Sequence, residues 1–227
     1  MTRIEIFEDR DRLADAAAAA MAEALGAPGA RSVVLTGGST PGPAYDRLSR
    51  APLDWPTITV TLTDDRWVDP ASDDSNERLL RARLLVAGAA KATFLPLKTA
   101  HASPREGAAS VDGALRSLTP FAGVLLGMGA DGHVASLFPG DPDLAAMLDP
   151  HGERLAVGVA MSGEKPYVPR ISLTLRALLD SAIVVILVSG DEKRRVLDRV
   201  RDDRDFAPPV AAILRQDRTP VRVLWAA

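Results

Sequence analysis

The chain contains no cysteine in its 227 residues. This absence excludes disulfide bonds, thiolate nucleophiles and zinc or iron–sulfur centres held by cysteine. Aromatic residues are also scarce, at 4%, whereas apolar residues make up 47% of the sequence. We therefore expect a folded protein with a sizeable, mainly aliphatic core.

Long apolar runs and a strong charge imbalance are absent as well. No apolar run approaches the roughly 18 residues that span a bilayer, and the first residues lack the apolar core of a signal peptide. The formal net charge is −3, which gives no general attraction to nucleic acid or to anionic membranes. We expect a cytoplasmic protein without a nucleic-acid or membrane partner, and any anion binding must be local.

Apolar runs that are typical of buried strands alternate along the chain with helical patterns. The predicted strands lie at 3–7, 31–36, 57–63, 93–97, 124–126, 155–161, 171–175, 181–188 and 221–225, and the predicted helices at 9–25, 44–48, 76–86, 105–118, 190–204 and 209–214. No linker, repeat or low-complexity tract divides the sequence. We predict a single α/β domain over 1–227, with a mostly parallel, Rossmann-like central sheet flanked by helices.

A short apolar run is followed by three glycines within residues 127–132, and this break carries Asp131 and His133. The glycines let the backbone take positive φ and approach a ligand closely. The pair lies at the carboxyl end of a buried strand, where open α/β sheets bind their ligands. His101 and His151 lie in predicted exposed turns, so His133 is the candidate general base.

The same break matches the dinucleotide fingerprint G-x-G-x-x-G in its letters. That fingerprint opens a long helix, whereas the sequence after His133 is stopped at Pro139. An acidic residue is also expected at the end of a following strand, and Glu153 lies before its strand begins. The context disfavours nicotinamide binding, and we expect no cofactor.

A second glycine turn, at residues 37–42, joins a buried strand to a helix. It is not a Walker phosphate loop, because no Gly-Lys-Ser/Thr follows. Two interpretations stay open: the N–H groups and the hydroxyls of Ser39 and Thr40 form a cradle for an anion, or one hydroxyl simply caps the helix.

Three cations stand at positions where strands and helices begin or end. Arg66 follows Asp64 and Asp65 at the close of an apolar strand, and Arg170 opens a strand. Lys193 lies in the first turn of a helix, where a cation opposes the helix dipole. A bound phosphate would offset that cost.

Several segments together resemble the 6-phosphogluconolactonase family, within the wider group that includes glucosamine-6-phosphate deaminases. The family order is kept over nearly the whole chain by Thr36-Gly-Gly-Ser-Thr-Pro41, Asp64-Asp-Arg-Trp-Val68, Ser75-Asn76, Gly127-Met-Gly-Ala-Asp-Gly-His-Val-Ala-Ser-Leu-Phe-Pro-Gly140, Pro169-Arg-Ile-Ser-Leu-Thr174 and Gly190-Asp-Glu-Lys193. One departure is Asp65, where the family usually has glutamate.

The resemblance implies hydrolysis of 6-phospho-D-glucono-1,5-lactone to 6-phosphogluconate, without a metal or cofactor. His133 would take a proton from the attacking water and later protonate the ring oxygen. Asp131 would orient the imidazole or contact sugar hydroxyls. The oxyanion would be stabilised by N–H groups of the glycine loops or by Arg66.

The resemblance also implies a phosphate site and a set of close backbone approaches. The phosphate would be held by Ser39, Thr40, Arg170 and Lys193, with Arg66 sharing it. The loop backbone positions are Gly37, Gly38, Gly129 and Gly132. We expect the protein to be a monomer or a weak dimer.

Two other functions are compatible with this resemblance. Deaminases carry a glutamate shortly after the histidine, and they tend to have tyrosine in place of Arg66. Here Ser136-Leu-Phe-Pro139 supplies no glutamate. A non-catalytic sugar-phosphate sensor would usually carry a helix-turn-helix, and it would not need the pair of Asp131 and His133.

Overall fold

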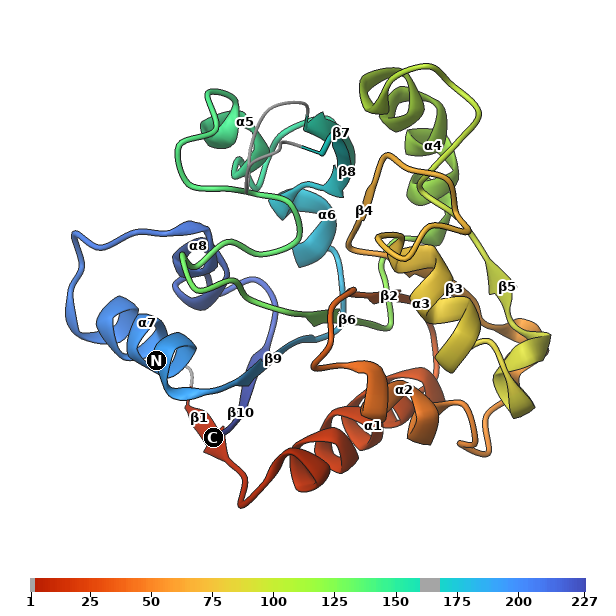
Figure 1. Ribbon diagram of the computed structural model, residues 1–227, viewed down its shortest axis with the longest axis horizontal. Helices are drawn as coiled ribbons and strands as arrows, with labels where there is room; N and C mark the ends of the chain where they lie inside the picture. The colour runs from red at the N-terminus through yellow and green to blue at the C-terminus, as the bar shows by residue number, and fades with distance from the viewer. Residues whose placement is uncertain (1–2, 160–167) are drawn as a thin grey trace.

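The computed structural model describes residues 3–159 and 168–227. Its centre is a sheet of seven parallel strands in the order β1-β10-β9-β6-β2-β3-β5 (Figure 1). These strands are β1 (Ile4–Ile6), β2 (Ser32–Leu35), β3 (Thr59–Leu62), β5 (Thr93–Phe94), β6 (Gly123–Leu126), β9 (Val184–Ser189) and β10 (Val221–Ala226). The predicted parallel sheet of an α/β protein is therefore confirmed.

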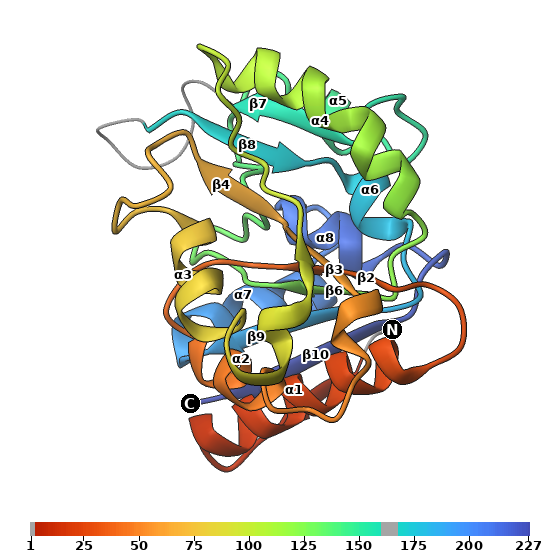
Figure 2. The ribbon, with the colours of Figure 1, turned by 90° about the vertical axis from the view of Figure 1, so that its right-hand side faces the viewer.

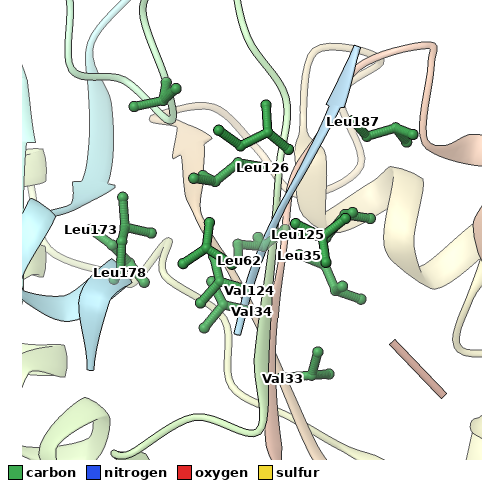
Figure 3. Close-up of a cluster of buried hydrophobic side chains, with 14 of the residues drawn as sticks. Val33, Val34, Leu35, Leu62, Val124, Leu125, Leu126, Leu173, Leu178 and Leu187 are labelled. Atoms are coloured by element: carbon green, nitrogen blue, oxygen red, sulfur yellow. The ribbon is translucent and has the colours of Figure 1, made fainter. Parts of the chain in front are cut away.

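The middle strands are apolar because both faces of the sheet are covered. Val34 and Val124 are paired in register and lie on the side of Leu173 and Leu178, as Figure 3 shows. Leu35 and Leu125 point to the opposite face, which packs against the first helix. These side chains are at most 1% exposed. The sheet is thus the rigid base from which the loops extend.

A second sheet of three antiparallel strands lies beside the first, in the order β4-β8-β7. It contains β4 (Asp64–Arg66), β7 (Ala156–Val159) and β8 (Arg170–Leu173). Figure 2 shows it above the central sheet with helix α4 lying over it. We had expected Asp64, Asp65 and Arg66 to close the preceding strand. That expectation was wrong, because the chain leaves the central sheet after Leu62 and these residues form a strand of the second sheet.

The predicted helices begin and end close to their predicted bounds, except that the one predicted at 76–86 ends at Arg83, and the short helix at Leu144–Met147 was not predicted. The observed helices are α1 (Arg10–Gly26), α2 (Gly42–Leu48), α3 (Asn76–Arg83), α4 (Pro104–Leu118), α5 (Leu144–Met147), α6 (Leu175–Leu179), α7 (Asp191–Asp202) and α8 (Pro209–Leu214), with 3₁₀ turns at Trp55–Thr57 and Ala87–Lys91. Within the described residues, no helix has the length and apolar character needed to cross a membrane.

Side-chain caps explain where several helices start. Asp9, Ser75, Ser103 and Thr174 each accept a hydrogen bond from a main-chain N–H in the first turn of the following helix. Helix α2 differs, because its N-cap residue is a proline and no side chain caps it. The interpretation of Ser39 or Thr40 as a helix cap is therefore wrong.

Several predicted elements differ in extent from the observed ones. The strand predicted at 93–97 is only Thr93–Phe94, and the strand predicted at 181–188 begins at Val184. The predicted strand at 155–161 corresponds to β7, and its last two residues lie outside the described part of the chain. The predicted helix at 190–204 is shorter, because Gly190 has a φ of 88° and precedes α7, which ends at Asp202. None of these differences in extent moves a predicted site residue to another element.

The strand order creates one position where neighbouring strands lead the chain in opposite directions. From β2 the chain continues to β3 on one side, and from β6 it continues to β9 on the other. The loops that follow β2 and β6 therefore diverge and leave a crevice at the carboxyl edge of the sheet. These two loops carry the glycine turns singled out in the sequence.

Packing of α4 on the second sheet predicts a test of the fold. A Cβ at Gly158 in β7 would lie 2.4 Å from the main-chain nitrogen of Arg105. Gly158→Ala should therefore lower the free energy of unfolding by about 1–3 kcal/mol, as overpacking does. Gly113→Ala in α4 is the control, because its Cβ meets nothing within 4 Å. Urea unfolding in which Gly158→Ala is as stable as this control would contradict the packing.

Candidate active site

A cavity of about 260 Å³ lies at the crevice between the diverging loops. It is lined by the ends of β2 and β6, by β4 and β8 of the second sheet, and by the start of α7. Nine of the predicted site residues line it: Gly37, Gly38, Ser39, Thr40, Arg66, Gly129, His133, Arg170 and Lys193. The other two, Asp131 and Gly132, do not line it and immediately precede His133 in the same loop.

His133 and Asp131 form a bonded pair. The imidazole Nδ1 lies 2.6 Å from Oδ1 of Asp131, and the main-chain N–H of His133 donates to the same oxygen at 3.0 Å. Burial raises the pKa of Asp131, but the hydrogen bonds from His133 outweigh it, so the pKa lies below its ordinary value. An ionised Asp131 holds the proton on Nδ1, which leaves the lone pair on Nε2.

Gly129 is required by the position of the His133 ring. A Cβ at Gly129 would lie 2.2 Å from the imidazole, which packs directly over this glycine. Gly132 has a φ of 81°, and the loop is closed by hydrogen bonds from Gly129 N–H to the His133 oxygen and from Gly132 N–H to the Gly129 oxygen. The two glycines thus fold the chain back so that the imidazole faces the cavity.

The most unusual electrostatic feature is a pair of arginines on adjacent strands. Arg66 in β4 and Arg170 in β8 are direct partners in the antiparallel register, so their side chains share one face. Like charges in this arrangement repel each other. Both residues line the cavity, and Lys193 lines it from α7. Three cations from three chain segments therefore surround one space, which suits an anion.

The arginines are held in place by neighbouring groups. Arg66 donates to the main-chain oxygen of Asp74 at 2.6 Å, and its Nε has no hydrogen-bond partner among the described residues although it is buried. The guanidinium of Arg170 lies over the ring of Phe138 at 5.2 Å. Burial lowers the pKa of Lys193 below its ordinary value. A bound anion would reverse that effect.

The first glycine loop, at residues 37–42, also lines the cavity. The hydroxyl of Thr40 lies 3.3 Å from that of Ser189 at the end of β9, and Ser39 is exposed to the cavity. Gly38 has a φ of 95°. A Cβ at Gly37 would overlap the amide of Asn76 at 1.8 Å. The loop therefore passes close over α3, and its hydroxyls are not used to cap a helix.

Asp64 and Asn76 are polar residues that line the cavity although the sequence had suggested no site role for them. In a strand, side chains alternate between the two faces, so Asp64 shares a face with Arg66 while Asp65 points away. This alternation could have indicated that Asp64 lies beside Arg66, but only if residues 64–66 had been recognised as a separate strand. Asn76 donates from its amide to the main-chain oxygen of Asp64 at 2.8 Å and so fixes α3 to β4.

Asp65 fixes the start of α3 from the other face of β4. It is fully buried, and its carboxyl group accepts hydrogen bonds from the main-chain N–H groups of Arg66, Asn76 and Glu77. Ser75 donates its hydroxyl to the same group at 3.3 Å. These bonds keep Arg66 and Asn76 at the cavity wall.

Other candidate sites do not gather the predicted residues. His101 and His151 are exposed and do not line this cavity. A larger cavity of about 670 Å³ lies at the start of β10 and contains several arginines. There Arg215 donates to four main-chain oxygens and Arg201 pairs with Asp198 and Asp202. In the described parts of the chain, no three His, Asp or Glu side chains come together as metal ligands.

The fold and the cavity together define an α/β protein with an anion site and a histidine–aspartate pair at the switch point of a parallel sheet. The chain matches a family model described as glucosamine-6-phosphate isomerases/6-phosphogluconolactonase over residues 8–225. It belongs to this family, which confirms the resemblance seen in the sequence.

Individual relatives cover almost the whole chain. A 6-phosphogluconolactonase of Caulobacter vibrioides is 46% identical over 99% of this chain and 97% of its own length. One of Rhizobium meliloti is 40% identical over 98% of both chains. A crystal structure of a 6-phosphogluconolactonase from Shewanella baltica has a TM-score of 0.91 and is 35% identical, covering 100% of this chain and 98% of the other.

The buried carboxyl group of Asp65 predicts a pH dependence of stability. Burial raises its pKa from 3.8 to about 6, and the main-chain donors only partly offset this. The folded protein then binds this proton more tightly than the unfolded chain, so its contribution to stability is present below about pH 4 and is lost as the pH rises to about 6. A difference of this size corresponds to about 3 kcal/mol.

The measurement is urea unfolding of the wild type and of Asp65→Asn between pH 4 and pH 7. The stability of the wild type relative to the variant should fall across this range and then become constant. A relative stability that is constant or rises over the same range would show that the carboxyl group is ionised throughout.

Proposed function

We propose that the protein hydrolyses 6-phospho-D-glucono-1,5-lactone to 6-phosphogluconate, a reaction of the oxidative pentose phosphate pathway. The observation that carries this proposal is one cavity that is lined both by three cations, Arg66, Arg170 and Lys193, and by His133. Its relatives named 6-phosphogluconolactonase support the choice of substrate. A sugar phosphate lactone has one anionic end and one electrophilic carbonyl, so it needs both the cations and the histidine that line this cavity.

The phosphate end binds first in this scheme. Arg66, Arg170 and Lys193 supply charge, and the hydroxyls of Ser39 and Thr40 supply further donors. The anion removes the repulsion between the paired arginines, so binding energy is gained at the end of the substrate that does not react. That energy positions the lactone carbonyl, which lowers the entropic part of the barrier.

His133 then acts as the general base. Its Nε2 takes a proton from water while the water oxygen attacks the ring carbonyl carbon, which forms a tetrahedral oxyanion. The ionised Asp131 stabilises the imidazolium that results. When the intermediate collapses, the bond between the carbonyl carbon and the ring oxygen breaks, and the imidazolium returns its proton to that oxygen. The products are the carboxylic acid and a free hydroxyl group.

The structure of the histidine loop reduces the number of candidate hydrogen-bond donors to the oxyanion. The N–H groups of Gly129 and Gly132 are already bonded within their loop. Arg66 lines the cavity, and its buried Nε has no hydrogen-bond partner among the described residues. We therefore assign the stabilisation of the oxyanion to Arg66 in preference to these two glycines.

The alternatives have less support in this cavity. A deaminase of this family would need a second acidic group beside the histidine, and Ser136 and Phe138 occupy that stretch. Among the described residues that line the cavity, the one carboxylate is Asp64, which is bonded to other side chains. A sensor would not need the bonded pair of Asp131 and His133. The proposal includes a cytoplasmic monomer or weak dimer.

The reaction is tested with lactone that is freshly generated by oxidation of glucose 6-phosphate. The rate of acid release should exceed the spontaneous rate, and it should scale with the amount of protein. Ammonia release from glucosamine 6-phosphate is measured in parallel. Ammonia release without lactone hydrolysis would reject the proposal in favour of a deaminase.

Replacement of the base gives the sharpest test of the chemistry. His133→Asn should lower kcat on the lactone by about 10²–10⁴-fold, as the loss of a general base does. His101→Asn and His151→Asn remove exposed histidines outside the cavity and should leave kcat unchanged. Equal activity of all three variants would remove His133 from the mechanism.

Loss of a cation should affect capture of the substrate. Lys193→Ala and Arg170→Ala should each raise KM about 10–100-fold, the value of one charge-assisted hydrogen bond. The non-phosphorylated gluconolactone should be a poor substrate for every variant, with little difference between them. Arg195→Ala removes an exposed cation from the same helix as Lys193 and is the control. The phosphate assignment is wrong if both lactones respond alike.

A further inference from the structure

The loop that carries His133 ends in a tight turn at residues 134–137. The turn is closed by a hydrogen bond from Leu137 N–H to the Val134 oxygen at 3.0 Å, and these two residues form an antiparallel bridge. Its second residue, Ala135, has a φ of 50°, a conformation that costs an alanine of order 1–3 kcal/mol. Something outside the turn must therefore hold it.

The turn sets the distance between two rings at the cavity. His133 precedes it and Phe138 follows it, and their ring centroids lie 4.5 Å apart. Ala135 itself lines the cavity. A shift of the turn would thus move the imidazole, its ring neighbour and part of the cavity wall together.

Ser136 is the residue by which the turn is held. It is fully buried, and its hydroxyl donates to Oδ2 of Asp64 at 2.6 Å. Its main-chain N–H donates to the hydroxyl of Ser172 at 3.1 Å. Asp64 and Ser172 are partners in the register of β4 and β8. One serine therefore bonds both strands that carry the arginines.

A second hydrogen bond, in addition to the one from Ser136, fixes the carboxyl group of Asp64. Its other carboxyl oxygen accepts from the hydroxyl of Thr63 at 2.8 Å, and its side chain is 5% exposed. Arg66 lies two residues along the same strand, on the same face. The second sheet and the histidine loop are thus joined by a buried chain of polar groups below the cavity.

We propose that Ser136, held by Asp64, is a positioning residue that sets the imidazole of His133 relative to Arg66 and Arg170. Ser136 does not line the cavity and acts through the turn. Without its hydroxyl, the strained turn relaxes and His133 moves relative to the bound lactone. The inference rests on the proposed lactonase function, and it adds a residue for which the sequence had suggested no role.

A rival account must be separated from this one. Asp64 lines the cavity, so its carboxyl group could contact the sugar directly and the bond to Ser136 could be incidental. Substitution of Asp64 alone does not distinguish the two accounts. Ser136 is buried away from the cavity, so its substitution does.

The experiment compares Ser136→Ala with Ser32→Ala, using the full chain and fresh lactone. Ser32 is a matched buried serine at the amino end of β2, at the opposite end of this strand from the cavity, and its hydroxyl donates to the Leu118 oxygen at 2.6 Å. Both variants should lose similar thermal stability. Ser136→Ala should lower kcat by about 10–100-fold, the effect of a small misplacement of a catalytic group, with KM changed less than about threefold. Ser32→Ala should keep the kcat of the wild type.

Three results would overturn the proposal. They are a wild-type kcat for Ser136→Ala, a change confined to KM, or a loss of kcat in Ser32→Ala as large as in Ser136→Ala. Asp64→Asn with low activity beside a fully active Ser136→Ala would establish the direct contact. If Ser136→Ala does not fold, Ser172→Ala removes the other bond to the turn and is judged by the same criteria. A wild type that fails to hydrolyse the lactone rejects the function itself, which is a separate outcome.

Discussion

The antiparallel pairing of β4 with β8 is the constraint on which the rest of the site depends. This register places Arg66 directly opposite Arg170, so both side chains leave the strand pair on the same face. Like charges directly opposite each other on paired strands repel, and an anion bound between them would offset that repulsion. Other contacts of the second sheet offset the free-energy cost of this repulsion. They are the packing of α4 on its outer side and the buried apolar residues between the two sheets. The site is therefore prepared for a ligand before one arrives.

The part of the cavity that is formed by the loops after β2 and β6 follows from the topology of the central sheet. Because β2 and β6 are neighbours that lead in different directions, their loops open toward the second sheet. The glycines of the β6 loop allow the imidazole of His133 to lie against the backbone, and Asp131 orients it. Burial at this edge lowers the local dielectric response, so the charges in the cavity act strongly on a bound substrate. The buried bonds of Ser136 join this part of the cavity to the arginines.

Much of the architecture could be read from local patterns. The continuous apolar runs of β2, β6 and β9 require burial on both faces, and the alternation with helices leaves a parallel sheet as the natural solution. The second sheet was not predicted, because β4 is three polar residues long and has no apolar signal. Its strand character comes from its partner β8, where Arg170, the partner of Arg66, lies 104 residues further along the chain. Pairing at such a distance leaves no trace in a local pattern. The sequence placed the loop of Ser39 and Thr40 correctly but left open whether its hydroxyls cap a helix or line an anion site. The structure excludes the cap on α2, and both residues line the cavity.

The sequence by itself determined the parallel α/β class and the identity of the chemical groups, since periodicity, glycine spacing and residue type are local properties. It also determined that His133, rather than His101 or His151, follows a buried strand. Only the tertiary structure decided that Arg66, Arg170 and Lys193 surround one space, that Asp64 shares it, and that Ser136 holds the histidine loop. Those facts depend on strand register and on the direction of each side chain. Both are set by the packing of segments that are distant in the sequence, because no single segment can bury its own apolar face.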